Sequence, residues 1–165
     1  MEVASRISRF DLATYRRVRS LARGDAVTWA RRYSRLGEHG ALWLAGGTLA
    51  AVLDRPRRAR WTRATASVGA GYVVSTSIKL VVRRRRPLVA DLPPLISTRT
   101  TLSFPSSHAV TSFAAVRAFG PLLPRAPLTA VGATMAFSRL FLGVHYPSDV
   151  AAGAVVGTLV GSLGR

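Results

Sequence analysis

Residues 138–149 read SRLFLGVHYPSD, an apolar run that contains an arginine and a histidine and ends at an aspartate. Charged groups are costly at membrane depth, and where they occur they face a bundle interior or a polar cavity. We therefore expect Arg139, His145 and Asp149 to point inward, with the last two meeting across a turn at Pro147. A histidine beside a carboxylate is poised for nucleophilic chemistry.

The composition combines strong positive charge with high hydrophobicity. The 165 residues include 24 basic and seven acidic side chains, a formal net charge of +17, yet 48% of the chain is hydrophobic. Basic and apolar residues occupy separate stretches, which favours an integral membrane protein with basic flanks over a soluble protein that binds nucleic acid. The absence of cysteine excludes disulfides and thiolate metal sites.

Five apolar segments predict an all-α, polytopic transmembrane helical bundle of four to five spans in the cell membrane. They are residues 40–53, 64–82, 107–123, 126–144 and 149–163. A span needs about 17 to 25 residues, so the first segment is short and the last is marginal. Residues 54–63 and 83–106 are predicted loops. Glycines 153, 157 and 161 form a small-residue face that favours packing within the bundle, with a homo-oligomer as the alternative.

The chain divides into a basic arm, residues 1–38, and a membrane domain, residues 39–165. Apolar residues at helical spacing within 10–21 and 25–36 predict two amphipathic helices, the second with Asp25 as its N-cap. Nine arginines in the arm suit a helix that lies on anionic lipid headgroups. The alternative is an ordinary solvated arm.

Alternation of the later four segments across the bilayer brings a set of polar residues to one membrane face. These are Lys79, Arg86, Ser106, Ser107, His108, Arg139, His145 and Asp149. Three clustered cations repel one another unless an anion lies between them, and guanidinium groups match phosphate oxygens well. The start of a helix at 106–108 adds free N–H groups and hydroxyls. The expected site is therefore a phosphate pocket.

Two histidines at this face complete a phosphoryl-transfer site. His145 is the candidate nucleophile with Asp149 orienting it, and His108 can protonate a leaving oxygen. Carboxylates are too few for a magnesium site, so no metal and no cofactor is expected. Other polar residues receive structural interpretations: His39 as a loop or cap residue, and Arg83, Arg84 and Arg85 as an interfacial basic flank.

Three motifs in this order resemble the signature of the type 2 phosphatidic acid phosphatase (PAP2) superfamily. They are KLVVRRRRP at 79–87, PSSH at 105–108 and SRLFLGVHYPSD at 138–149. The resemblance covers about residues 54–163. It implies a phosphohistidine on His145 and a phosphate held by Lys79, Arg86, Ser106, Arg139 and a backbone amide near Ser107. Ser107 departs from the family, which usually has glycine there.

The resemblance also implies a substrate, a lipid phosphate. Among compact, arginine-rich members the chain is similar to an actinobacterial group that dephosphorylates decaprenylphosphoryl-5-phosphoribose. Polyprenyl diphosphates, phosphatidate and phosphatidylglycerophosphate are alternatives, and a non-catalytic scaffold with a lipid-binding arm is an alternative of another class. If residues 40–53 span, the positive-inside rule favours an active site on the cytoplasmic side; if they are re-entrant, the count reverses.

Overall fold

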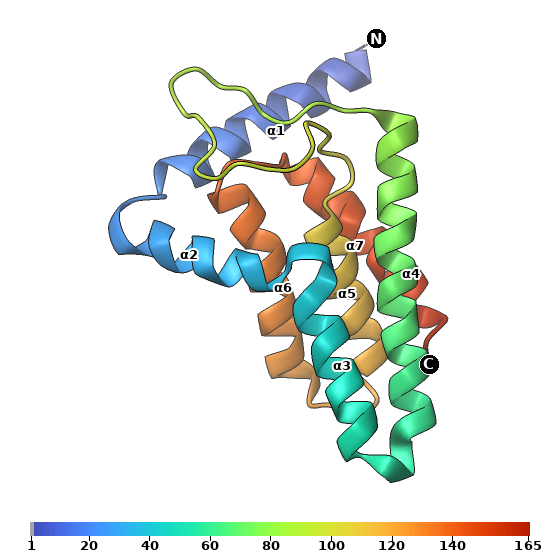
Figure 1. Cartoon of the computed structure of the whole chain (residues 1–165). Helices are drawn as coiled ribbons and strands as arrows, with labels where there is room; N and C mark the ends of the chain where they lie inside the picture. Colours follow the sequence, from blue (N-terminus) through green and yellow to red (C-terminus); the bar gives the residue numbers. More distant parts are fainter. Residues whose placement is uncertain (1) are drawn as a thin grey trace.

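The computed structural model describes the backbone of residues 2–165 and the side chains of residues 9–165. The regular secondary structure of the described residues is helical, apart from an isolated bridge between Arg85 and Leu102. Two helices of the arm lie across one end of a bundle formed by the other five (Figure 1). In chain order the elements are α1 Glu2–Ser20, α2 Gly24–Leu36, η1 Glu38–Gly40, α3 Ala41–Leu53, η2 Arg55–Arg57, α4 Arg58–Val82, α5 Ser107–Phe119, α6 Arg125–Phe141 and α7 Pro147–Ser162.

Helix α5 is the centre of the bundle. Most of its residues are buried, because small side chains on nearly all its faces let α4, α6 and α7 approach. The predicted small-residue face of α7 packs directly on it: a Cβ added at Gly157 would lie 3.0 Å from the Ala114 nitrogen. Packing of these glycines within the bundle is therefore confirmed.

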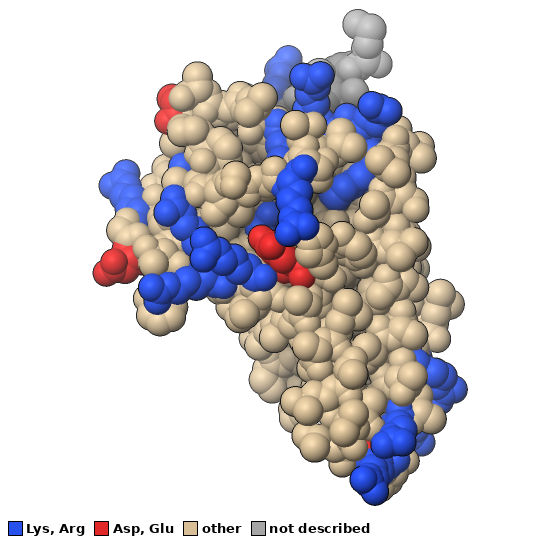
Figure 2. All heavy atoms as spheres, in the orientation of Figure 1, with Lys and Arg blue, Asp and Glu red and all other residues tan. Residues whose placement is uncertain are grey.

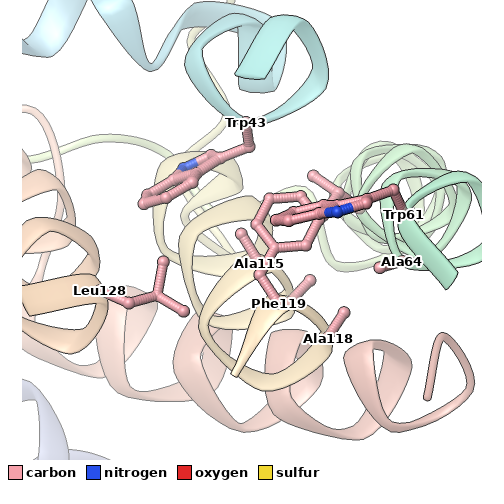
Figure 3. Packing of buried hydrophobic residues seen from close by; sticks show 9 residues of the cluster. Trp43, Trp61, Ala64, Ala115, Ala118, Phe119 and Leu128 are labelled. Atoms are coloured by element: carbon pink, nitrogen blue, oxygen red, sulfur yellow. The ribbon is translucent and has the colours of Figure 1, made fainter. Parts of the chain in front are cut away.

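An aromatic cluster holds α3 and α4 to α5 at the end of the bundle away from the arm (Figure 3). The rings of Trp61 and Phe119 have centroids 5.3 Å apart at 59°. The indole of Trp43 donates a hydrogen bond of 3.1 Å to the Ser112 hydroxyl, so its polar edge is satisfied inside the core. This cluster fixes the positions of α3, α4 and α5 relative to one another.

All five apolar segments are helical, but their ends differ from the expectation. Helix α4 begins at Arg58, so most of the predicted loop 54–63 is helical. Helix α2 begins at Gly24 with Arg23 as its N-cap, so the assignment of Asp25 to that position was wrong. Gly24 has a positive φ of 55°, which lets the chain turn into the helix there. Asp25 lies in the first turn, where a carboxylate still favours the helix dipole.

Charge on the visible face is confined to the two ends of the molecule, with a largely uncharged band between them (Figure 2). Exposed apolar residues such as Val73, Val81, Val155 and Leu159 belong to the bundle helices. Within the described residues one helix, Arg55–Val82, is long and apolar enough to cross a bilayer. Helices α3 and α5 have 13 residues each, about 20 Å at the rise of an α-helix.

Candidate active site

A cavity of about 540 Å³ lies at the end of the bundle that the arm covers. Six of the eight predicted site residues line it: Lys79, Arg86, Ser107, His108, Arg139 and His145. The other two, Ser106 and Asp149, are fully buried behind this lining. These residues come from the end of α4 and the loop after it, the start of α5, the end of α6, the loop before α7 and the first turn of α7, so the structure brings the predicted set together.

Two of the three cations are buried helix residues held by neighbouring polar atoms. Lys79, 7% exposed, donates to the carbonyl oxygen of Ser103 at 3.1 Å and also to that of Pro105. Arg139, 5% exposed, donates to the hydroxyl of Ser34. Neither cation pairs with a carboxylate in the described structure, so both keep their charge available to an anion in the cavity.

Arg86 is the third cation and touches the candidate nucleophile. Its Nε donates to the Thr100 carbonyl oxygen at 2.9 Å and its Nη1 to the Val144 carbonyl oxygen at 2.6 Å. The same Nη1 is 2.9 Å from Nε2 of His145. Because arginine has no acceptor, Nε2 must accept this bond, and the proton of neutral His145 is on Nδ1.

His145 lies in the loop between α6 and α7 and is 2% exposed. Burial lowers its pKa well below the ordinary histidine value, and the charges of Arg86, Arg139 and Lys79 lower the pKa further. Its Nδ1 is 3.4 Å from Oδ2 of Asp149. A neutral ring with an unprotonated Nε2 at a cationic cavity is the state that nucleophilic attack requires.

Asp149 is positioned by the start of α7. Its Oδ2 accepts a hydrogen bond of 2.8 Å from the backbone N–H of Tyr146, which completes a capping box. Pro147 begins the helix, where its missing N–H has no cost. The four-residue spacing seen in the sequence therefore turns the carboxylate back toward the His145 ring.

The N-terminus of α5 supplies the second histidine. Nε2 of His108 is 3.0 Å from the Ser34 carbonyl oxygen, so this nitrogen carries a proton. The hydroxyls of Ser107 and Ser75 are 2.7 Å apart, which directs the non-glycine side chain at 107 toward α4. Ser106 caps the helix, and its buried hydroxyl has no hydrogen-bond partner among the described residues.

The sequence interpretation missed three residues that support the site. Arg84 was assigned to a basic flank, but it is 28% exposed and pairs with both Asp149 and Asp11. Ser34 of α2 contacts both Arg139 and His108. The scarcity of acids in so basic a chain was the one available signal for Asp11.

His39, predicted as a loop or cap residue, lies inside the short 3₁₀ turn η1 between α2 and α3, and it also lines the cavity. Its φ of 54° is in the left-handed region, which is uncommon outside glycine. Its Nδ1 is 2.7 Å from the Tyr72 hydroxyl on α4. Together with the loop residues Thr98 and Thr100 they contribute polar groups to the lining of the cavity.

Comparison with known proteins places this helical bundle among the phosphatases. The family model of the PAP2 superfamily matches residues 60–164, which include all eight predicted residues. The chain is 37% identical to the decaprenylphosphoryl-5-phosphoribose phosphatase of Mycobacterium tuberculosis, over 98% of this chain and 92% of that protein. It is 39% identical to the protein of the same name from Mycolicibacterium smegmatis, over 79% and 73%.

The chain belongs to the PAP2 superfamily and is a lipid phosphatase of the membrane. The crystal structure of Aquifex aeolicus LpxE has the same fold, with a TM-score of 0.79 over 93% of each chain and 21% sequence identity. The predicted all-α fold and the family resemblance are confirmed.

Proposed function

We propose that this phosphatase hydrolyses a polyprenyl-linked phosphate, such as decaprenylphosphoryl-5-phosphoribose, through a phosphohistidine on His145. The observation that carries the proposal is the single cavity that joins Arg86, Arg139 and Lys79 to a neutral histidine backed by a carboxylate. The names of the mycobacterial relatives support the choice of lipid.

The first step is attack on phosphorus. The three cations and the backbone at Ser107 hold the phosphate, and Arg86 turns its Nη1 from His145 to a phosphate oxygen, which frees the Nε2 lone pair. Nε2 forms a bond to phosphorus while the P–O ester bond breaks. In the substrate complex His108 carries a proton on both ring nitrogens, because the bound phosphate offsets the surrounding positive charge. Its Nε2–H stays on the Ser34 carbonyl oxygen, and its Nδ1 proton passes to the leaving alkoxide, so His108 ends neutral. Asp149 stabilises the charge that develops on the His145 ring.

The second step regenerates the enzyme. His108, now neutral and short of one proton, accepts a proton from water, whose oxygen attacks the phosphohistidine. The P–N bond breaks, inorganic phosphate is released and His145 returns to its starting state. The charge on phosphorus is neutralised throughout by Lys79, Arg86 and Arg139, so the proposed reaction requires no metal.

The rim of the cavity supports a leaving group that carries hydroxyls. His39, Tyr72, Thr98 and Thr100 also line the cavity and offer hydrogen bonds in addition to those that the phosphate uses. Arg99, also at the rim, is suited to a second phosphate on the same substrate. A phosphorylated sugar linked to a lipid through a phosphodiester has these groups.

The proposed orientation is multi-pass, with the arm on anionic headgroups at the same face as the site. Trp29, 68% exposed, and Phe10, 64% exposed, are suited to this interface. The arm holds nine arginines, and residues 83–86 and Arg99 add to that face. The other face has the five arginines of 55–63 with Arg125 and Arg165, so we propose a cytoplasmic active site.

A lipid phosphate panel tests the function. Purified protein in detergent with EDTA is given decaprenylphosphoryl-5-phosphoribose, undecaprenyl diphosphate and phosphatidate, and released phosphate is measured. We expect the sugar-linked lipid to have the highest kcat/KM and His145→Ala to release none. Unchanged turnover in His145→Ala contradicts the mechanism, and a preference for another lipid corrects the substrate.

A further inference from the structure

Asp11, on the arm helix α1, is a fully buried carboxylate outside the region that matches the family. Its Oδ2 accepts hydrogen bonds of 2.6 Å from Nη2 of Arg84 and 2.6 Å from the Ser148 hydroxyl. Its Oδ1 accepts a bond of 2.9 Å from the Ser148 backbone N–H. A buried carboxylate is costly unless it is paired and hydrogen-bonded, and here the partners are Arg84, in the loop after α4, and Ser148, in the first turn of α7.

Arg84 links this carboxylate to the candidate catalytic pair. Its Nη1 is 2.9 Å from Oδ1 of Asp149 and 2.6 Å from the Ser148 hydroxyl. Its guanidinium carbon lies 4.3 Å from the centre of the Tyr146 ring. Because the guanidinium group is planar and rigid, one side chain held at both ends fixes the position of Asp149.

We propose that Asp11 is a positioning residue for catalysis, and this rests on the proposed role of His145. Through Arg84 it holds Asp149 in place, with Oδ2 3.4 Å from Nδ1 of His145, so that the charge of the carboxylate favours the ring orientation in which Nε2 faces phosphorus. The arm helix α1 is thereby part of the catalytic device. Asp11 does not line the cavity and touches no substrate.

The positive charge of the site gives this arrangement a physical reason. Lys79, Arg86 and Arg139 already line the cavity, and a further unpaired guanidinium beside them would compete for the phosphate. Asp11 pairs with Arg84 and keeps it behind the catalytic residues. The pairing also supplies the outer hydrogen bonds that hold a catalytic carboxylate in one orientation.

Anchoring of α1 does not depend on Asp11 alone. The Tyr15 hydroxyl donates to the Leu92 carbonyl oxygen at 2.9 Å, and Nη2 of Arg19 donates to that of Pro93 at 2.8 Å. Arg16 forms an exposed ion pair of 2.7 Å with Asp91. Helix α1 therefore remains docked when Asp11 is changed. A substitution at Asp11 then changes only the positions of Arg84 and Asp149.

The test uses the full chain in detergent with the lipid phosphate that the wild type hydrolyses best. Asp11→Asn keeps the shape and removes the charge, and we expect kcat to fall about 10- to 100-fold, as is typical for outer-layer partners of a reactive group. We expect KM to change less than about twofold, since the phosphate contacts stay. The matched control, Asp91→Asn, removes the carboxylate that pairs with Arg16 of α1 and should behave as the wild type.

Two further readouts separate positioning from a merely structural role. The double variant Asp11→Asn/Arg84→Gln should lose no more than Arg84→Gln alone, because both changes break one linkage. Inhibition by vanadate, which mimics the transition state, should weaken in parallel with kcat, whereas inhibition by inorganic phosphate should not change. Arg84→Lys, which keeps the charge but cannot hold two carboxylates with one planar group, should match Asp11→Asn and serves if that variant does not fold.

Wild-type kcat in Asp11→Asn or in Arg84→Lys would overturn the proposal, as would losses that multiply in the double variant. An equal weakening of vanadate and phosphate inhibition would assign Asp11 to general folding instead. Failure of the proposed function has a different signature, because the wild type would then release no phosphate from any lipid on the panel.

Discussion

At the scale of single residues, the reactivity of His145 follows from its surroundings. Arg86 donates to Nε2, so the ring is neutral and its proton is on the side of Asp149. The lowered pKa has the sign that a nucleophile needs: burial and nearby cations disfavour the imidazolium, so the ring stays neutral to more acidic pH. Binding of a phosphate anion then relieves the surplus positive charge.

The lowered pKa of His145 predicts how turnover depends on pH. Since attack requires neutral His145, the acid limb of kcat/KM should lie below about 6.5, the ordinary histidine pKa. Arg86→Gln removes the nearest charge that lowers the pKa of His145, so the limb should move to higher pH. The lost phosphate contact should lower kcat/KM by about 10²- to 10³-fold.

The matched control is Arg85→Gln, the same substitution at an exposed neighbour that does not line the cavity. It should leave both the acid limb and kcat/KM at the wild-type values. An acid limb that does not move in Arg86→Gln would contradict the role of Arg86 as the neighbour that keeps His145 neutral.

At the scale of helices, the sequence predicted the elements better than their ends. Apolar runs predicted the five bundle helices, and apolar residues at helical spacing predicted the two arm helices, because each helix buries an apolar face. The start of α4 at Arg58 was missed, since arginine is a good helix former and a run of basic residues does not by itself indicate a loop. Aspartate is a preferred N-cap residue, which is why the sequence predicts a cap at Asp25. The positive φ of Gly24, which starts the helix one residue earlier, cannot be predicted from local spacing.

The contact of α7 with α5 makes a prediction about stability. Gly157→Ala places a methyl group 3.0 Å from the Ala114 nitrogen and closer still to the Val110 carbonyl oxygen. The crowding should cost about 1–3 kcal/mol of folding free energy. The shift of α7 should also lower kcat, since its first turn carries Asp149. Thermal unfolding in detergent, followed by circular dichroism, measures the first effect.

Gly46→Ala is the control for this prediction, because nothing lies within 4 Å of a Cβ added at that position of α3. The same substitution there should stabilise the protein by about 0.5–1 kcal/mol through helix propensity. An unfolding temperature for Gly157→Ala at or above that of the wild type would show that α5 and α7 are not closely packed.

At the scale of the whole molecule, the contacts between the arm and the site could not be predicted from the sequence. The motif residues were predictable because polar side chains stand out at the ends of apolar segments, and alternating segments bring those ends to one membrane face. Asp11 and Arg84 are 73 residues apart, and Ser34 and Arg139 are 105 apart, so no local pattern relates them. Their contacts arise from how α1 and α2 lie across the bundle end (Figure 1). Tertiary packing alone joins the arm to the site.

This arrangement gives a test of membrane orientation. Because α1 and α2 cover the cavity end, the arm and the site share one face, and the larger number of arginines on that face predicts that it is cytoplasmic. The chain has no cysteine, so any labelling by a thiol reagent comes from the single cysteine that is introduced. Ala90→Cys marks the site end and Leu123→Cys marks the other end, and both positions are exposed.

In intact cells, an impermeant maleimide should label Leu123→Cys and leave Ala90→Cys unlabelled until the membrane is opened by detergent. Each variant should keep wild-type phosphatase activity, which shows that the thiol has not disturbed the fold. Labelling of Ala90→Cys from outside would instead assign the site to the outer face. Labelling of both thiols would contradict a fixed orientation and, with it, the proposal that the arginine-rich arm anchors the site end to the cytoplasmic leaflet.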